Sequence, residues 1–119
     1  MQLSKVKTAE LTGAALDWAV AKALDYDVFI SPFNDVMRKI SEPIGCYRFE
    51  PSTNWSHGGP LIEEHIEHMS VQPGNMWAAV AIGDFTYQKA DAPLLAACRA
   101  IVSHHLGYEV EMPNDLTGA

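Results

Sequence analysis

The sequence has few basic residues, and no long apolar run interrupts its polar residues. Lys and Arg number 8 against 15 Asp and Glu, which gives a formal net charge of −7 at pH 7. Binding to nucleic acid depends on Lys and Arg that neutralise phosphates, so this balance argues against a nucleic-acid partner. The acidic charge is also repelled by anionic membranes, and no segment reaches the roughly 18 apolar residues that cross a bilayer.

Cysteine is equally scarce. Cys46 and Cys98 make no disulfide framework in a chain of 119 residues, 48% of them hydrophobic, which is long enough to form one domain with its own core. Cys98 falls on the apolar face of a predicted helix, which predicts a buried free thiol. The first residues lack the apolar core of a signal peptide, so we expect a cytoplasmic protein.

Apolar residues recur at helical spacing in two segments. The first helix is predicted from Thr12 to about Leu24. Its inner face would hold Leu11, Ala14, Ala15 and Trp18, and its outer face Glu10, Asp17 and Asp25. The second is predicted to begin after Asp91 as its cap and to end at Gly107. Its inner face would hold Leu94, Cys98, Ile101, Val102 and His105, and its outer face Arg99 and Ser103.

Alternation of polar and apolar residues predicts the strands. They are expected at residues 3–7, 28–30, 46–49 and 108–112, and at 67–71 and 76–82. The last two flank Gln72-Pro73-Gly74-Asn75, a good turn sequence, and should form a β-hairpin. Asn34 or Asp35 is expected to cap a short helix through Ile40, ended at Pro43.

These elements predict an α+β fold, with two main helices packed on a small, mostly antiparallel sheet. We expect a single domain over residues 1–113 and a flexible C-terminal tail over residues 114–119.

The most unusual stretch spans residues 52–63 and reads STNWSHGGPLIE. Gly58 and Gly59 are expected to free the backbone in a loop, and Pro60 to start a short helix after it. Trp offers area for stacking and Asn offers directional hydrogen bonds, so this stretch is predicted to form a recognition surface. The candidate ligand-binding residues are Asn54, Trp55, His57, Gly58, Gly59 and Glu63.

Other interpretations of these residues stay open. The His57-Gly58-Gly59 run is similar to the oxyanion-hole loop of esterases, but the sequence has no Gly-x-Ser-x-Gly nucleophile motif. It could equally be a turn that needs two glycines. On one continuous helix His65 and His68 would share a face, as ligands of a metal site can, but we expect the chain to pass from helix to strand between them, and no third and fourth ligand is evident nearby. No metal, cofactor or catalytic residue is predicted.

Four segments together carry a family resemblance: residues 6–20, 52–63, 92–102 and 106–113. In order and spacing they resemble the NinX-like small proteins of lambdoid phages and prophages, a family of unknown function. The resemblance implies a phage or prophage origin and a location in the host cytoplasm. It implies no reaction, and residues 25–50 lie outside it.

Our leading hypothesis is a non-enzymatic accessory protein that binds a small molecule or a host protein. A sponge for host nucleotide signals is its narrower form, which would require positive residues such as Arg48 or Arg99 near the site because the chain is acidic. One alternative is a small hydrolase that uses the His57-Gly58-Gly59 loop with Glu63. Another is a purely structural interaction protein, for instance a homodimer.

Overall fold

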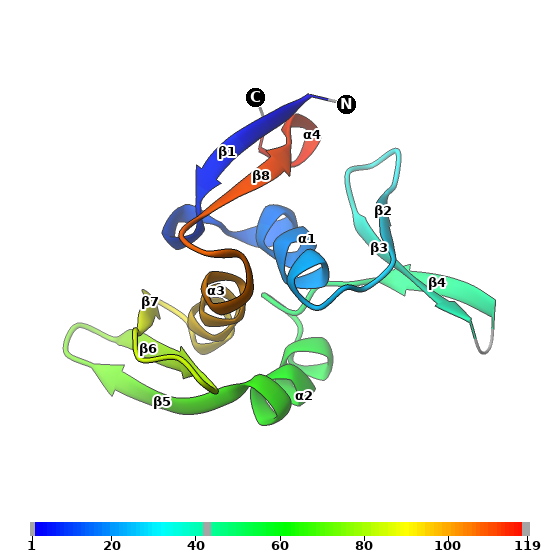
Figure 1. Cartoon of the computed structure of the whole chain (residues 1–119). Coiled ribbons are helices and arrows are strands. Elements are labelled where there is room, and N and C mark those ends of the chain that lie inside the picture. Colours follow the sequence, from blue (N-terminus) through cyan, green and yellow to red (C-terminus); the bar gives the residue numbers. More distant parts are fainter. Residues whose placement is uncertain (1, 42–43, 118–119) are drawn as a thin grey trace.

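A computed structural model describes residues 2–41 and 44–117 (Figure 1). In chain order the elements are β1 (Leu3–Lys7), the 3-10 helix η1 (Thr8–Glu10), α1 (Gly13–Ala23), β2 (Val28–Ile30), β3 (Val36–Ser41), β4 (Ile44–Arg48), α2 (Trp55–His65), β5 (Ile66–Gln72), β6 (Met76–Ala81), β7 (Gln88–Ala90), α3 (Pro93–Leu106), β8 (Glu109–Pro113) and α4 (Asn114–Thr117).

The strands of the described residues form three small antiparallel sheets, ordered β1-β8, β2-β3-β4 and β5-β6-β7. In Figure 1 they surround α1 and α3, which lie side by side at the centre. Helix α3 contacts strands of the first and third sheets, whereas α1 contacts strands of the first and second. The α+β class is therefore confirmed, with three sheets in place of the single sheet expected.

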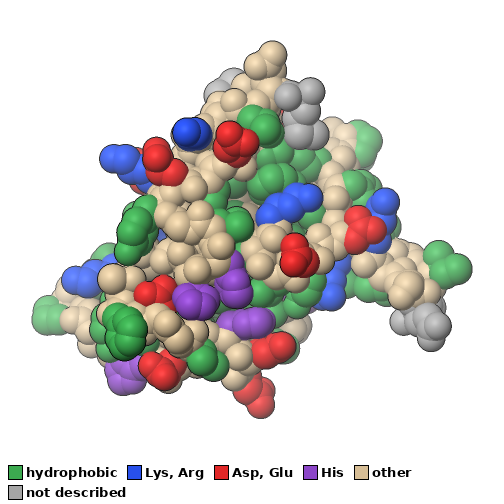
Figure 2. Space-filling view, viewed as in Figure 1, with side chains coloured by type: hydrophobic (Ala, Val, Ile, Leu, Met, Phe, Trp, Pro, Cys, Tyr) green, Lys and Arg blue, Asp and Glu red, His purple; other side chains and the backbone are tan. Residues whose placement is uncertain are grey.

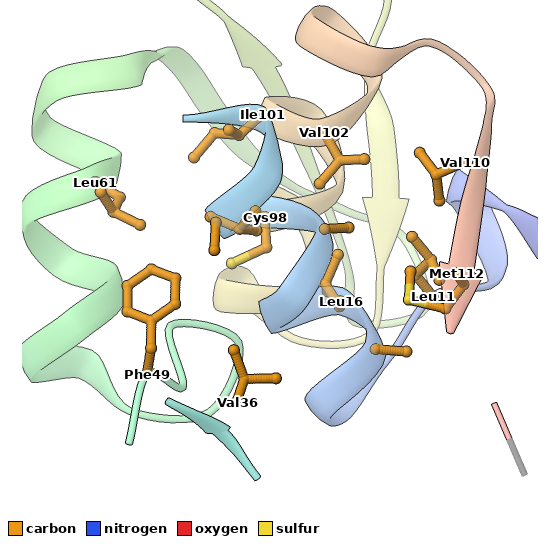
Figure 3. Close-up of a cluster of buried hydrophobic side chains, with 14 residues drawn as sticks. Leu11, Leu16, Val36, Phe49, Leu61, Cys98, Ile101, Val102, Val110 and Met112 are labelled. Atoms are coloured by element: carbon orange, nitrogen blue, oxygen red, sulfur yellow. The ribbon is translucent and has the colours of Figure 1, made fainter. Parts of the chain in front are cut away.

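The main core lies between α1 and α3. Leu16 and Val20 of α1 and Ile101 and Val102 of α3 are almost completely buried, and each such side chain stabilises the fold by about 1.5–3 kcal/mol. Figure 3 shows that Phe49 and Leu61 close this cluster on one side and Val110 and Met112 on the other. A second cluster joins α3 to the third sheet through alanines: Ala79, Ala90, Ala96 and Ala100.

The predicted hairpin is confirmed. Strands β5 and β6 pair antiparallel from Gln72 and Met76 back to Ile66 and Ala81. Gly74 between them has φ +82°, the left-handed conformation that a turn of this kind requires at this position. The connection that follows β6 contains one further short strand, β7.

The helix predicted after Asn34 is wrong, because residues 36–41 form strand β3. Asn34 adopts φ 63° in the turn between β2 and β3, where the Ser31 hydroxyl accepts from the N–H groups of Phe33 and Asp35. β3 is the middle strand of its sheet and pairs with both neighbours, so strand pairing overrides the local capping signal. The expected break at Pro43 lies outside the described residues.

The faces of the two main helices differ in part from those predicted. In α1, Asp17 lies inside and is only 4% exposed, while Trp18 is partly buried against the core. In α3, Cys98 is buried as expected, but Ser103 is also buried and His105 is exposed. A helical wheel assigns one face to water, whereas these helices are contacted from more than one side.

The ends of α3 and the C-terminal residues complete the fold. Ala92, not Asp91, is the N-cap of α3, whereas Gly107 ends the helix with φ 90°, as predicted. Residues Asn114–Thr117 form a helical turn, α4, that contacts β8, β1 and α1, which adds structure to the tail expected to be loose. Among the described residues no helix is long and apolar enough to cross a membrane.

Candidate functional site

The central stretch forms helix α2 rather than a loop followed by a helix, so the expectation that Pro60 starts the helix is wrong. Asn54 is the N-cap, and its side-chain oxygen accepts from the Ser56 N–H at 2.9 Å. Asn is a strong capping residue, and this bond lets the helix begin at Trp55, well before Pro60. Pro60 then lies inside the helix, where it cannot donate to the carbonyl of Ser56, and both residues are exposed to solvent.

The two glycines of α2 have different surroundings. Neither is among the positive-φ residues, so backbone freedom is not their role. A Cβ on Gly58 would lie 2.5 Å from Leu94 Cδ2 and 2.5 Å from the Pro51 carbonyl oxygen, whereas a Cβ on Gly59 would meet nothing within 4 Å. Gly58 therefore allows α2 to approach the start of α3 closely, and Gly59 meets no such requirement.

His57 faces inward. Its Nδ1 accepts from the Glu50 N–H at 3.1 Å, and its ring stacks on Phe49 with centroids 6.2 Å apart. The Tyr47 ring makes an edge-to-face contact with it as well, at 5.3 Å between centroids. These contacts join α2 to the end of β4, so His57 is part of the packing between the two elements.

Trp55 faces outward and is 57% exposed. It lines a cavity of about 430 Å³, which we call the Trp55 cavity. The other lining residues are Thr12, Gly13, Ser52, Thr53, Ala92, Pro93, Leu94 and Leu95, so α1, α2 and α3 all begin at its edge. Of the six candidate residues, Trp55 lines this cavity; Asn54 caps the helix, His57 and Gly58 pack inward, and Glu63 is exposed farther along α2.

A buried carboxylate lies behind the wall of the Trp55 cavity. Asp17 of α1 accepts from the Ser52 N–H at 2.8 Å, and the Ser52 hydroxyl donates to the Gly13 carbonyl at 3.4 Å. Burial raises the pKa of Asp17 to about 6; the hydrogen bonds from Ser52 lower it, and the charge of Glu50 raises it. Burial, and secondarily the Asp17 charge, also raises the pKa of the Cys98 thiol, which therefore stays protonated.

The chain was compared with known protein families. Residues 7–105 match the family described as Bacteriophage P22, NinX. The chain belongs to this family. The match spans α1, α2, the β2-β3-β4 and β5-β6-β7 sheets and nearly all of α3, so the lining of the Trp55 cavity lies within the NinX-family region. The predicted resemblance is confirmed, and the protein is a phage accessory protein. A comparison with curated proteins finds no match.

In this NinX-family chain the expected change from helix to strand between His65 and His68 is confirmed. Helix α2 ends at His65 and β5 begins at Ile66, so His65 and His68 lie on different elements. His65 instead lies near His105, with ring centroids 6.3 Å apart, and His105 near His104, at 5.0 Å. Burial and the neighbouring His104 and His65 lower the pKa of His105.

Figure 2 shows histidines gathered on this face beside acidic side chains. Within residues 2–41 and 44–117, no three His, Cys, Asp or Glu residues are placed to hold a metal ion.

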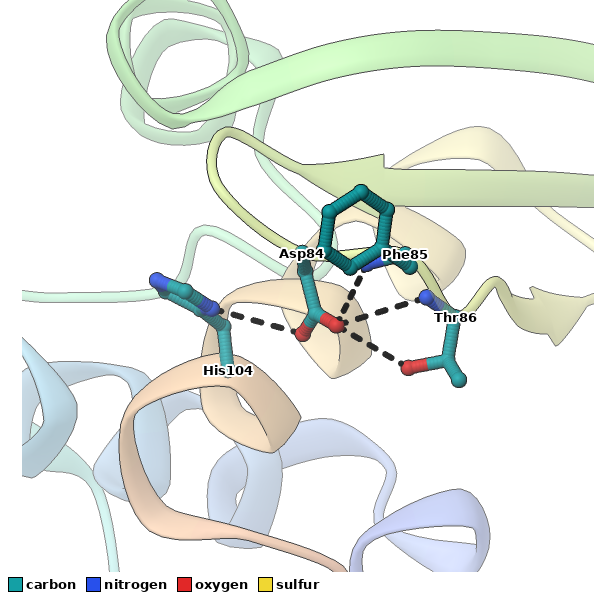
Figure 4. Close-up of polar contacts among 4 residues, drawn as sticks. All are labelled: Asp84, Phe85, Thr86 and His104. Atoms are coloured by element: carbon teal, nitrogen blue, oxygen red, sulfur yellow. Dashed lines mark hydrogen bonds and ion pairs between the residues drawn. The ribbon is translucent and has the colours of Figure 1, made fainter.

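One ordered loop was missed by the sequence reasoning. Asp84 follows β6, and its Oδ1 accepts from the N–H of Phe85 at 2.7 Å and from the N–H and hydroxyl of Thr86 (Figure 4). His104 of α3 contacts Asp84 Oδ2 at 3.3 Å. The Phe85 N–H is the main cause that lowers the pKa of Asp84. Phe85 itself is 96% exposed. Gly83 followed by Asp84, soon after the end of a strand and with Thr86 two residues later, is the turn signal that could have revealed this loop.

Proposed function

We propose that the protein is a binding module that acts without catalysis and holds a small molecule in the Trp55 cavity. The observation that carries this proposal is the exposed indole of Trp55 at the edge of a concave, mostly apolar surface. Cavities of a few hundred cubic ångströms with apolar walls and a few polar groups are the usual form of small-molecule sites.

The construction of the cavity supports this proposal. Pro93, Leu94 and Leu95 supply apolar surface, while the exposed Thr12 and Thr53 supply hydroxyl groups that can fix the orientation of a ligand. The walls come from the N-terminal ends of three helices and from the turn that precedes α2. Since the buried Gly58 brings α2 close to Leu94, the walls belong to the packed part of the molecule and are held in place before a ligand arrives.

The hydrolase alternative receives less support from the geometry. The Nδ1 atom of His57 accepts from the backbone of Glu50, and the ring is packed against Phe49. Glu63 lies six residues after His57 on α2, which places the two side chains about 120° apart around the helix axis. A base and its orienting carboxylate need to be within hydrogen-bond reach, so this pair is poorly arranged for acid–base chemistry.

For the narrower proposal of a nucleotide sponge, the structure offers a group that could bind the base of a nucleotide but no free arginine among the two considered for its phosphate. The indole of Trp55 is suited to stacking against a base. The two arginines considered for phosphate binding are engaged elsewhere. Arg48 pairs with Asp35 at 3.3 Å, and Arg99 donates to the carbonyls of Leu11 and Lys89.

The test uses a protein-free extract of soluble molecules from the bacterial host. Purified wild-type protein and the Trp55→Ala variant are each incubated with the extract and separated from unbound molecules by gel filtration. The retained molecules are then released by denaturation and identified by mass spectrometry. We expect at least one molecule to be retained by the wild type and lost from Trp55→Ala. Because Trp55 is largely exposed, the variant should keep the wild-type stability to within about 0.5 kcal/mol.

Val71→Ala is the matched control, because Val71 is 59% exposed and lies on β5, outside the cavity lining. This control should retain the same molecules as the wild type. Equal retention by Trp55→Ala and the wild type, or no specific retention at all, would contradict the proposed function.

A further inference from the structure

Resting on the proposed function, we infer that the Trp55 cavity recognises a flat aromatic ring, which stacks on the indole of Trp55, rather than a charged group. The ligand class is therefore that of small aromatic and heteroaromatic molecules, nucleobases and their nucleosides included.

The lining of the cavity carries the first part of this inference. None of its nine residues has a charged side chain, although the chain as a whole carries a net charge of −7. The other described cavities each include an acidic residue. They contain Asp115, Glu64, Glu10, or Glu109 with Glu111. A ligand recognised through its charge would find no partner of opposite charge among the side chains of the Trp55 cavity, and an unpaired charge is costly to desolvate.

The arrangement of the apolar groups carries the second part. Trp55 belongs to the first turn of α2, whereas Pro93, Leu94 and Leu95 belong to the first turn of α3. A ring that lies on the indole can therefore also contact apolar groups from a second helix. Among the lining residues Trp55 is the one aromatic side chain, so any stacking in this cavity involves Trp55.

The charges behind the walls do not favour an ionic ligand of either sign. The first turns of the three helices carry partial positive charge from their free N–H groups. The carboxylate of Asp17, bonded to the N–H of the lining residue Ser52, opposes that charge. The hydroxyl groups of Thr12 and Thr53 remain to pair with polar atoms on the edge of a ring, since the Ser52 hydroxyl is buried and donates to the Gly13 carbonyl.

The experiment separates ring stacking from apolar contact and from charge. Calorimetric titrations use adenosine, guanosine, cytidine, uridine and indole, the 5′-monophosphate of each nucleoside, and cyclohexanol as a non-aromatic ring. They are repeated on the variants Trp55→Phe and Trp55→Leu. Phe keeps an aromatic face, whereas Leu keeps apolar area without one.

We expect at least one aromatic probe to bind more tightly than cyclohexanol. Trp55→Leu should weaken that binding about ten- to hundredfold, since stacking on an aromatic side chain contributes an effect of this order. Trp55→Phe should weaken it less than Trp55→Leu does. A phosphate added to a bound nucleoside should change the affinity by less than about threefold, because no cationic side chain lines the cavity.

Three results would overturn the inference while leaving the proposed function intact. They are equal binding of the probe by Trp55→Leu and the wild type, a phosphate that strengthens binding tenfold or more, and retention from the host extract of a molecule that has no aromatic ring. Each still leaves a ligand in the protein. If no probe binds the protein and no molecule is retained from the extract, the proposed function fails together with the inference.

Discussion

The glycine pair of α2 offers the sharpest test of the packing described above. Gly58 and Gly59 are adjacent and belong to the same helix, yet alanine at the two positions should act in opposite directions. In a helix interior, Ala is favoured over Gly by about 0.5–1 kcal/mol, because Gly loses more backbone entropy on folding. At Gly59 an added Cβ meets nothing within 4 Å, so Gly59→Ala should stabilise the protein by this amount.

Gly58→Ala has the same helical gain but creates two overlaps. Leu94 can relieve one of them, because its Cδ2 atom is the end of a flexible side chain. The other is with the backbone oxygen of Pro51, which is fully buried and cannot move alone. Overpacking of this kind typically costs about 1–3 kcal/mol. The 2.5 Å contact with a backbone oxygen places this cost in the upper half of that range, so after the helical gain is subtracted Gly58→Ala should lower the free energy of unfolding by about 1–2.5 kcal/mol.

Urea unfolding followed by circular dichroism measures both variants under one condition. The slope of the free energy against urea concentration should be unchanged, so that the midpoint alone moves. For a chain of this size the melting temperature should fall by about 4 °C per kcal/mol. A Gly58→Ala variant as stable as the wild type would refute the argument. So would a Gly59→Ala variant that loses as much stability as Gly58→Ala.

Three further predictions concern other parts of the molecule. The pKa of Asp17 is about 6 in the folded protein, above its ordinary value of 3.8, so wild-type stability should rise as the pH falls from 6 to 4. In urea unfolding, Asp17→Asn should therefore be more stable than the wild type by about 1–3 kcal/mol at pH 7.5, and this difference should disappear near pH 4. A difference in stability that does not change with pH would contradict the raised pKa of Asp17. Asp84→Ala should speed hydrogen exchange at the Phe85 N–H while the melting temperature changes little, and unchanged exchange would contradict the role of Asp84 in ordering the loop. Leu16→Ala should cost about 2–5 kcal/mol in the same unfolding assay, because Leu16 is completely buried, and a loss below 1 kcal/mol would contradict its place in the core.

Local signals predicted the elements that depend on local interactions. The β5–β6 hairpin follows from alternation around Pro73-Gly74, and the end of α3 follows from Gly107. Strand β3 could not be found in this way. Its sequence is compatible with a short helix, and its state is decided by pairing with Phe29 on one side and Tyr47 on the other. Such pairings depend on chain segments that a local pattern does not include.

The same limit applies to the candidate site. The sequence singled out Trp55, whose exposed ring lines the cavity, but assigned the glycines to a loop. Asp17 was placed on a solvent-facing side, because its partner, Ser52, lies 35 residues away along the chain. The cavity also depends on Pro93 and Leu95, which nothing in residues 52–63 indicates. Its lining comes from three separated segments, and only their packing brings them together.

The alanines of α3 bear on how this phage protein can change over generations. Ala96, Ala97 and Ala100 are at most 2% exposed, and α3 is contacted by α1, α2 and η1 and by strands of two sheets. A larger side chain at one of these positions would push against whichever neighbour lies over it. We therefore expect inherited differences among relatives to accumulate at the outer hairpin tips, while the small residues along this helix persist.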